Sequence, residues 1–383
     1  MNNRFLLISN AYPSSENIYR NGFIHRRVKS YLDKDYKVDV FYLHSSFLNA
    51  DIYTYDGVTV NTGNREHYEN FLKINEYDNY LIHFVNPDMY FPIVNNIDNP
   101  NITIWIHGFE AENWHRRWFN FLNSKSDLVK VLNQAEEYFP NQLNFLHNIY
   151  LEEKINVKFI HISKWFKESV ADIDAKAIPK KCWIIPNIVD GEIFDYQEKS
   201  IDKRTKILSI RPYASKKYAN DLSVEAVEIL SKTPFFEELE FHFYGDGILF
   251  NKVLEPIKKF KNVHINKKFL TQDEITKIHN DFGVFLCPTR WDSQGVSMCE
   301  AMSSGLVPVS NNNTAIPEFV THNFSGLLAK SDNSRDIAYQ IERLYYNQEL
   351  FTYLSENAAS SIRSIADENV VIDKELDVII HGI

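Results

Sequence analysis

Residues 284–305, VFLCPTRWDSQGVSMCEAMSSG, decide the fold of this chain. The run Val284–Cys287 is short and apolar, which is typical of a buried strand, and Val296–Ser304 has the spacing of a helix. Gly305 follows at a position where glycine commonly ends a helix. The turn between them would lie at the carboxyl end of a strand, where open α/β sheets bind ligands. The segment therefore predicts a strand, a turn and a helix, with a binding site in the turn.

Two acids stand in this segment with seven residues between them, Asp292 in the turn and Glu300 in the helix. At that spacing both carboxylates can face one cavity. The backbone N–H groups that open the helix can hold an anion, and glycine permits a close approach. The candidate binding positions of the turn are Ser293, Gln294, Gly295 and Val296. The alternative is that Asp292 caps the helix and Glu300 is a solvated side chain.

The segment resembles the acid-x7-acid motif of family 4 retaining glycosyltransferases, usually Glu-Gly-Phe-Gly-x4-Glu-Ala-Met-Ala-x-Gly. The positions that fit are Gly295, Glu300, Ala301, Met302 and Gly305, whereas Asp292 replaces a glutamate and Ser293-Gln294 replaces Gly-Phe. Residues 307–310, 315–320 and 323–328 also follow the family's order. The resemblance implies an α/β fold of the GT-B type, with two Rossmann-like domains facing across a cleft. It also implies transfer of a sugar from a nucleotide diphosphate donor to an acceptor hydroxyl, with retention at the anomeric carbon.

Length and composition suit a globular protein of two domains. The chain has 383 residues, too many for one ordinary core. Its 44% hydrophobic content is that of a folded protein, and its net charge of -10 argues against a general nucleic-acid binder. Its three cysteines stand in apolar contexts, which suits reduced, buried thiols. The first residues lack a signal-peptide pattern, and no apolar run approaches the roughly 20 residues that span a bilayer. We therefore expect a cytoplasmic protein, at most peripheral at the inner membrane face.

Alternating strand and helix patterns predict a parallel sheet in the N-terminal half. The apolar runs typical of strands are 5–9, 38–43, 57–60, 80–85, 102–107, 159–163 and 182–186. The segment 183–194 is similar to the family's Pro-Asn-Gly-Val-Asp-x3-Phe sequence, which ends the first domain. We expect an N-terminal acceptor-binding Rossmann-like domain over 1–197 and a C-terminal Rossmann-like domain that binds the nucleotide-sugar donor over 204–364. The last helix, about 365–383, is expected to pack back onto the first domain.

Cations follow the first predicted strand of the second domain. Arg211 ends that strand, and Lys216 and Lys217 lie in the loop after it. Two or three cations at the end of a buried strand suit a diphosphate, since they neutralise its charge without a metal. The alternative is a set of solvated loop charges. The resemblance to the family's Gly-Arg-x4-Lys-Gly segment implies that Arg211 and Lys217 grip the donor phosphates. As further donor-side residues we name Gly245, in a glycine turn, and Phe269 and Leu270, which the resemblance places near the base.

A histidine stands at a predicted strand end in the first domain. The run Ile102–Ile106 delivers His107 to that end, and the acid Glu110 follows. The resemblance places such a histidine beside the donor sugar and the acceptor, so His107 is a candidate catalytic residue together with Asp292 and Glu300. The alternative is a satisfied structural histidine, and we prefer that reading for His83.

The segment 113–122 mixes arginines with large aromatic residues and leads into a mostly helical stretch. Arg116 and Arg117 are candidates for contact with a glycan, a lipid-linked saccharide or an anionic membrane surface. An ordinary amphipathic helix with solvated arginines explains the pattern equally well. In the loop 10–23, Gly22 remains of the paired glycines of the family's first loop and is another acceptor-side candidate. A plain surface connection is the alternative for this loop.

The resemblance thus implies a retaining glycosyltransferase, and we expect it to work without a metal or a cofactor. Its substrates would be a nucleotide sugar and a glycan or lipid-linked saccharide, in bacterial surface-polysaccharide or glycoconjugate assembly. No nucleic acid is expected as a partner, and peripheral membrane contact is a further expectation. Among enzymes, the alternative is a glycogen-phosphorylase-like or epimerase activity on the same fold, but this chain shows neither a cofactor-bearing lysine motif nor the extra length of phosphorylases. From another class, the alternative is a catalytically inactive GT-B homologue that binds sugars or stabilises a partner, which the replacement of glutamate by Asp292 keeps open.

Overall fold

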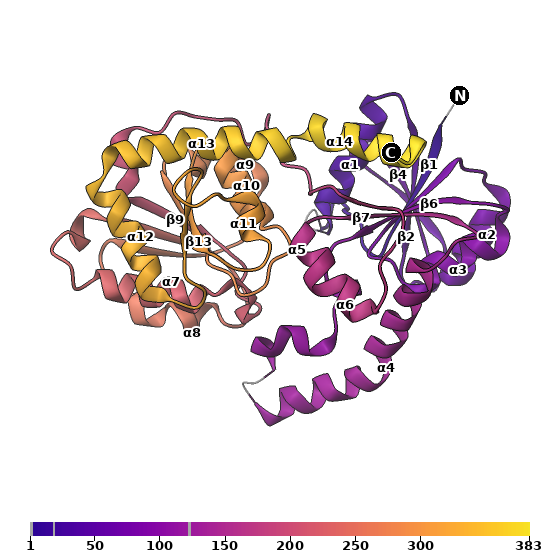
Figure 1. The fold of residues 1–383 in the computed structure, drawn as a ribbon, viewed down its shortest axis with the longest axis horizontal. Coiled ribbons are helices and arrows are strands. Elements are labelled where there is room, and N and C mark those ends of the chain that lie inside the picture. Colours follow the sequence, from indigo (N-terminus) through magenta and orange to yellow (C-terminus); the bar gives the residue numbers. More distant parts are fainter. Residues whose placement is uncertain (1–2, 18–19, 122–123) are drawn as a thin grey trace. The chain divides into compact units, whose positions relative to one another are not determined.

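A computed structural model of the chain describes residues 3–17, 20–121 and 124–383. The chain forms two compact units, each with a β-sheet and helices (Figure 1). The first, called the N-terminal unit, comprises Met1–Arg116, Val129–Ile188 and Glu368–Ile383. The second, called the C-terminal unit, comprises Arg117–Leu128 and Val189–Asp367. These two units confirm the predicted α/β class.

The N-terminal unit contains an eight-stranded sheet in the order β3-β4-β2-β1-β5-β6-β7-β8. Its strands are β1 (Arg4–Ser9), β2 (Lys37–Leu43), β3 (Asp51–Tyr55), β4 (Val58–Gly63), β5 (Asn79–His83), β6 (Asn101–Ile106), β7 (Asn156–His161) and β8 (Cys182–Ile184). Neighbouring strands from β4 to β8 pair parallel, as predicted. The edge strand β3 pairs antiparallel with β4. The sequence did not predict β3, because its side chains are largely exposed and lack an apolar run.

Helices connect these strands in chain order. They are α1 (Gly22–Asp33), α2 (Arg65–Ile74), α3 (Pro87–Asn96), α4 (Lys125–Tyr150), α5 (Lys164–Phe166) and α6 (Asp172–Ala175). Asn64 and Asn86 accept backbone N–H groups at the starts of α2 and α3, which satisfies donors that a helix cannot satisfy itself. The core of the unit contains fully buried side chains such as Val28, Leu81 and Trp105. The buried sheet and the capped helices therefore hold the residues at the strand ends in place.

The last segment of the chain belongs to the N-terminal unit, as α14 (Glu368–Leu376) and a π-helical turn (Asp377–His381). Glu375 fixes it there, because its carboxylate accepts hydrogen bonds from Arg27 Nε at 2.9 Å, the Tyr31 hydroxyl at 2.6 Å and Trp105 Nε1 at 2.9 Å. The Arg27 and Glu375 side chains are both fully buried. Removing either partner would leave a buried charge uncompensated, at a cost of about 3–5 kcal/mol.

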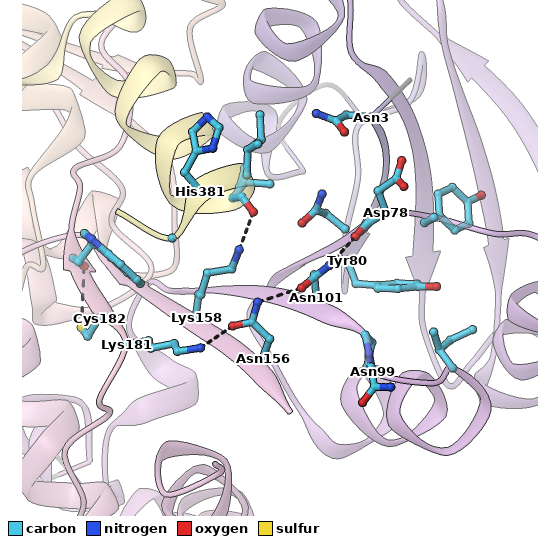
Figure 2. Close-up of a pocket in the computed structure, with 18 of the residues that line it drawn as sticks. Asn3, Asp78, Tyr80, Asn99, Asn101, Asn156, Lys158, Lys181, Cys182 and His381 are labelled. Carbon is cyan, nitrogen blue, oxygen red and sulfur yellow. Dashed lines mark hydrogen bonds between the residues drawn. The ribbon is translucent and has the colours of Figure 1, made fainter. Parts of the chain in front are cut away.

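A cavity of about 1010 Å³ lies at the amino ends of β1, β5, β6, β7 and β8 in the N-terminal unit (Figure 2). Figure 2 shows Lys181, Asn156 and Asn101 joined in a row: Lys181 Nζ donates to Asn156 Oδ1 at 2.7 Å, and Asn156 Nδ2 donates to Asn101 Oδ1 at 2.9 Å. Lys158, on the other side, donates to the carbonyl of Ile379 in the last segment. Ligands of open α/β sheets bind at the carboxyl ends of the strands, so this cavity is not our candidate site.

The C-terminal unit contains a six-stranded parallel sheet in the order β11-β10-β9-β12-β13-β14. Its strands are β9 (Lys206–Ile210), β10 (Glu240–Gly245), β11 (Val263–Lys267), β12 (Val284–Leu286), β13 (Val307–Asn311) and β14 (Leu327–Ala329). Its helices are α7 (Asn220–Leu230), α8 (Phe250–Leu254), α9 (Gln272–His279), α10 (Val296–Ser303), α11 (Ile316–Phe319), α12 (Ser334–Tyr346) and α13 (Gln348–Ala366). The strand β12 and the helix α10 confirm the predicted strand, turn and helix. Gly305, just after α10, has a φ of 84°, a conformation that favours glycine.

Candidate functional site

The turn between β12 and α10 is organised by the carboxylate of Asp292. Its Oδ1 atom accepts hydrogen bonds from the backbone N–H of Gly295 at 2.9 Å and of Gln294 at 3.4 Å. The residue that precedes α10 is Gly295, with φ 81° and no side-chain cap, so Asp292 is not the cap of this helix. The first N–H groups of α10, those of Val296 and Ser297, have no carbonyl within the helix to bind. They give the turn the positive end of a helix dipole.

Arg211 brings a buried positive charge to the same turn. It follows β9, and only 4% of its surface is exposed. Its Nη1 atom donates to the Ser297 hydroxyl at 2.8 Å, and its Nη2 atom lies 3.8 Å from Asp292 Oδ2. Because the guanidinium is next to the first turn of α10, the helix terminus and the cation both favour an anion here.

The loop that contains Lys216 and Lys217, called the lysine loop, is linked to Arg211 by the ring of Tyr218. Tyr218, which stands where the family has a glycine, has its ring centroid 4.5 Å from Arg211 Cζ and 5.1 Å from Lys217 Nζ. Such distances are those of cation–π contacts. The hydroxyl of Ser215 accepts the backbone N–H of Lys217 at 3.1 Å, which shapes the short turn 216–218. The structure thus brings both predicted phosphate-binding side chains to one ring.

Arg290 holds this lysine loop against the turn after β12. Its Nη1 donates to the carbonyl of Lys216 at 3.2 Å, and its backbone N–H donates to the carbonyl of Lys217 at 2.8 Å. Its guanidinium binds both carboxylate oxygens of Asp221, at 2.7 and 2.8 Å, and Asp332 Oδ1 at 3.0 Å. Sequence reasoning did not single out Arg290. Its position two residues before Asp292 was the only local signal, since its partners lie far away in the chain.

The other predicted donor-side residues lie at the same edge of the sheet. Gly245 ends β10 with φ 149°, and a Cβ there would lie 2.0 Å from the carbonyl oxygen of Arg211, so only glycine allows the two strands to approach so closely. Phe269 and Leu270 follow β11; the side chain of Phe269 is exposed and that of Leu270 is buried. Glu300 lies within α10 and is partly buried. Since parallel strands point the same way, the ends of β9, β10, β11 and β12 meet at one edge.

In the N-terminal unit, His107 follows β6 and pairs with a second histidine. Its Nε2 lies 2.9 Å from His83 Nδ1, and the two rings stack. Burial lowers the pKa of both imidazoles well below the ordinary value, so both are neutral at neutral pH. Only 7% of the His107 surface is exposed. Its ring also contacts Phe84, which has a φ of 59°, an uncommon conformation for a bulky residue.

Glu110 shapes the turn after this strand. Its carboxylate accepts the backbone N–H of His107 at 2.5 Å and of Gly108 at 3.0 Å. Burial raises the pKa of Glu110 to about 7, against the lowering effect of those hydrogen bonds. Gln142 of α4 donates to the Glu110 carbonyl at 3.0 Å. The predicted acceptor-side acid is therefore a buried group that supports the position of His107.

The remaining acceptor-side candidates lie in different settings. Gly22 begins α1, and a Cβ there would meet nothing within 4 Å; Ile18 and Tyr19 of the same loop lie outside the described residues. Arg116 binds both oxygens of Asp174, at 2.8 and 3.0 Å, and the Asp174 side chain is buried. The Arg116 guanidinium is thus neutralised within the N-terminal unit. Arg117, in the short helical segment Trp114–Asn120, is partly buried.

A second cavity, of about 570 Å³, opens at the carboxyl ends of the N-terminal strands. It is lined by polar side chains that include Asn10 after β1, His44 after β2, Asn64 after β4, and Asn86 and Asp88 near β5. Arg65, also in the lining, is paired with Glu69 at 3.0 Å and with Asp88 at 3.1 Å. Amide, imidazole and carboxylate groups of this kind suit hydrogen bonding to hydroxyl groups.

Closely spaced aspartates are a further pattern that can bind a metal ion. The Asp-x-Asp triplets of the sequence are 33–35 and 172–174. In the second, Asp172 pairs with Lys167 at 2.6 Å and Asp174 with Arg116, so both carboxylates are already neutralised. The first lies at the end of α1. Neither triplet belongs to the C-terminal unit that holds Arg211. None of the helices over the described residues is long and apolar enough to cross a membrane.

These features define the class of protein. Two α/β units, with a buried cation and a glycine turn at the carboxyl edge of the second sheet, make a GT-B fold. Residues 192–361 match the family described as glycosyl transferases group 1. Over these residues, which make up most of the C-terminal unit, the chain is therefore similar to the group 1 glycosyltransferases.

Relatives among characterised proteins agree with this assignment. The poly(ribitol-phosphate) alpha-N-acetylglucosaminyltransferase of Staphylococcus aureus is 28% identical over 161 residues, 41% of this chain and 32% of that protein. The amylovoran biosynthesis glycosyltransferase AmsK of Erwinia amylovora is 29% identical over 145 residues, 36% of this chain and 35% of that protein. The chain thus spans about a third of the length of these relatives.

Solved structures share the fold over almost the whole chain. Sucrose-phosphate synthase from Thermosynechococcus elongatus has a TM-score of 0.74 at 12% identity, covering 98% of both chains. HepE of Anabaena, in complex with UDP and glucose, has a TM-score of 0.68 at 12% identity, covering 99% of this chain and 100% of that one. A glycosyltransferase from Rickettsia africae reaches 0.70 at 14% identity, covering 99% and 98%. At such identities the likeness shows the fold alone.

Proposed function

We propose that this protein is a retaining glycosyltransferase that moves a sugar from a nucleotide diphosphate donor to an acceptor hydroxyl without a metal. The observation that carries the proposal is Arg211, buried beside the first turn of α10 and in contact with both Ser297 and Asp292. Asp292 Oδ2, 3.8 Å away, is an anion within the chain that faces this charge, and the remaining guanidinium donors with the helix N-terminus favour a second anion. A diphosphate is such an anion, and HepE, of the same fold, was solved with UDP.

The chain's own residues can stabilise the departing nucleoside diphosphate. The guanidinium of Arg211 uses one donor on Ser297, and its Nε atom is buried without a hydrogen-bond partner among the described residues. Arginine has five N–H groups, so donors remain for phosphate oxygens. Lys217 adds a second cation through the loop that Arg290 fixes. Together with the helix N-terminus, these cations supply the electrostatic stabilisation that a metal supplies elsewhere.

We assign different work to the two acids. Glu300 would accept hydrogen bonds from the donor's ribose hydroxyls, and Asp292 from hydroxyls of the transferred sugar. Asp292 already binds the amides of Gln294 and Gly295, which leaves its Oδ2 atom, near Arg211, as the atom available to a sugar hydroxyl. Phe269, whose side chain is exposed after β11, would lie near the base.

On the acceptor side, the polar cavity of about 570 Å³ in the N-terminal unit is our candidate for the glycan. His107 would act as a neutral imidazole, positioned by His83 and by the turn that Glu110 shapes. The Staphylococcus and Erwinia relatives are named for a poly(ribitol-phosphate) acceptor and for amylovoran. These names support a role in surface-polysaccharide or glycoconjugate assembly, with a glycan or lipid-linked saccharide as acceptor.

Peripheral contact with the inner face of a membrane is part of this proposal. The helix α4 exposes Val129, Leu132 and Tyr138, and the exposed Phe109 stacks on Tyr138 with ring centroids 5.6 Å apart. Aromatic and aliphatic side chains of this kind can enter the headgroup region. Sedimentation with anionic and neutral liposomes at low and high salt tests it, with Leu132→Ser as the weakened variant. Equal, negligible binding to both lipids would remove the membrane contact and leave the transferase proposal untouched.

The central experiment is release of nucleoside diphosphate from a panel of sugar donors, with and without glycan acceptors. We expect acceptor-dependent release with one donor, and an α-linked product from an α-linked donor. A catalytically inactive homologue would bind a nucleoside diphosphate in a calorimeter and release none from any donor. That outcome would replace the transferase with the sugar-binding alternative.

A further inference from the structure

Three metal-ligating side chains meet on one face of the C-terminal sheet. Glu240 and His242 stand two residues apart on β10, so they share a face of the strand. His264 on β11 lies directly abreast of His242 in the parallel register. β11 is the edge strand of the sheet, and His264 is exposed. Two strands that pair through their backbones therefore present one group of side chains to the solvent.

The three side chains are close enough to share an ion. One ligand atom of each lies within 4.8 Å of the others. His242 Nε2 is 2.6 Å from Glu240 Oε1, and the two imidazole rings have centroids 4.4 Å apart. Phe282 packs edge-on against His242 at 4.8 Å and forms an apolar wall behind it. Ligands around a tetrahedral zinc at about 2.1 Å stand about 3.4 Å apart. Small rotations of the His264 and Glu240 side chains would therefore bring all three ligand atoms to the spacing that one ion requires.

We propose that Glu240, His242 and His264 bind a divalent transition-metal ion, with zinc as the best fit and water at the fourth position. Two imidazoles and one carboxylate suit zinc, whereas magnesium and calcium prefer oxygen ligands alone. Lys206 on β9 is the register partner of Glu240 and places a positive charge close to the group. We therefore expect micromolar affinity, weaker than that of zinc sites built from thiolates.

This site is separate from the proposed sugar transfer. Glu240 lies five residues and His242 three residues before Gly245, which ends β10, so the ion would lie roughly 10–16 Å along the strand from the donor edge. At that distance it cannot contact the diphosphate. Its effect would be to join the edge strand β11 to β10 through side chains as well as backbone hydrogen bonds, which stabilises the C-terminal unit.

The first test is zinc binding to the full chain. The protein is prepared without a polyhistidine tag, stripped with a chelator, dialysed, and titrated with ZnCl2 in a calorimeter. We expect one zinc per chain, and an affinity at least about tenfold weaker for His264→Ala. His115→Ala removes an exposed histidine outside the group and serves as the control. Equal affinity of His264→Ala and the unchanged protein, or no bound zinc, would overturn the proposal.

Two further measurements report the geometry of the bound ion and its effect on the stability of the protein. Co2+ at the site should give the visible absorption of a tetrahedral ion, lost in His264→Ala. Zinc should raise the thermal midpoint of the unchanged protein and not that of His264→Ala, because only a ligand that binds the folded state stabilises it. Turnover should be the same with and without zinc. If the unchanged protein turns over its donor but binds no zinc, only the metal site is refuted. If it binds zinc but shows no turnover, only the transferase proposal is refuted.

Discussion

Arg211 donates a hydrogen bond from Nη1 to the Ser297 hydroxyl at 2.8 Å, across a separation of 86 residues. The bond joins the end of β9 to the first turn of α10, two elements that meet only because β9 and β12 are neighbours in the sheet. It places a permanent positive charge at the positive end of a helix, where the Asp292 carboxylate lies 3.8 Å away and the remaining guanidinium donors favour a further anion. This one contact connects the fold of the C-terminal unit to its proposed chemistry.

Replacing Arg211 by alanine should lower kcat/KM about 100-fold to 1000-fold, because the cation acts on charge that develops as the diphosphate leaves. Arg211→Lys should recover only part of the loss, since a lysine cannot keep the Ser297 contact and present several donors together. Steady-state kinetics of nucleoside-diphosphate release measures both. The control is Arg335→Ala, an exposed arginine of the same unit. An unchanged rate in Arg211→Ala would contradict the donor site.

The two acids should differ in the step they affect. Glu300→Gln should mainly weaken binding of the free nucleoside diphosphate, because we assign Glu300 to the ribose. Asp292→Asn should mainly slow sugar transfer, because Asp292 lies in the turn beside Arg211 and is assigned to the transferred sugar. Calorimetry with the nucleoside diphosphate and turnover assays separate the two effects. Equal losses of nucleoside-diphosphate affinity in both variants would argue against this division of work.

Chelation should leave turnover intact. Arg211 and Lys217 can take the electrostatic role of a metal at the diphosphate, and the Asp172 and Asp174 carboxylates are bound to Lys167 and Arg116. The measurement is the rate in excess EDTA against the rate with added manganese. A complete loss of turnover in EDTA that manganese restores would exclude the metal-independent mechanism.

Two glycines should respond oppositely to alanine. Gly245→Ala would place a Cβ 2.0 Å from the Arg211 carbonyl oxygen at a φ of 149°, so the strand ends must move apart. We expect a loss of about 1–3 kcal/mol in the free energy of unfolding and weaker donor binding. Gly22→Ala meets nothing within 4 Å at the start of α1 and should be neutral or slightly stabilising. Denaturant unfolding of the two variants is the test, and equal stability would refute the steric argument.

Glu110 should make stability fall as pH rises. Its pKa is about 7 in the folded chain against an ordinary value of 4.5, so between these values the folded state holds a proton that the unfolded state releases. The free energy of unfolding should therefore decrease from about pH 4.5 to about pH 7 by about 3 kcal/mol from this group. His83 and His107 act in the opposite direction, because burial lowers their pKa values in the folded chain. Their contribution to the free energy of unfolding therefore decreases as the pH falls below 6.5.

The comparison of Glu110→Gln with the unchanged protein isolates the glutamate, because both contain the two histidines. The slope of unfolding free energy against pH should become less negative in the variant between about pH 4.5 and pH 7. The exposed Glu349→Gln is the matched control and should leave the slope unchanged. Identical slopes for Glu110→Gln and the unchanged protein would show that Glu110 titrates in the same range in both states.

The sequence by itself determined the elements around residues 284–305. The apolar run became β12, the helical spacing became α10, and Gly305 ended the helix with a positive φ. These features depend on local periodicity and on backbone preferences of single residues, which are readable without a structure. The same reading missed β3, because its most buried side chains are only half-buried and the strand has no apolar run.

Only the tertiary structure decided which distant side chains meet. In the folded chain Arg290 pairs with Asp221, Arg116 pairs with the buried Asp174, and His264 lies beside His242. A period of two or of 3.6 residues tells which face of an element is buried, but it does not tell the register between two parallel strands. It also does not tell which carboxylate a long arginine side chain reaches. The strand register and the arginine's partner both depend on how segments that are far apart in the chain pack together.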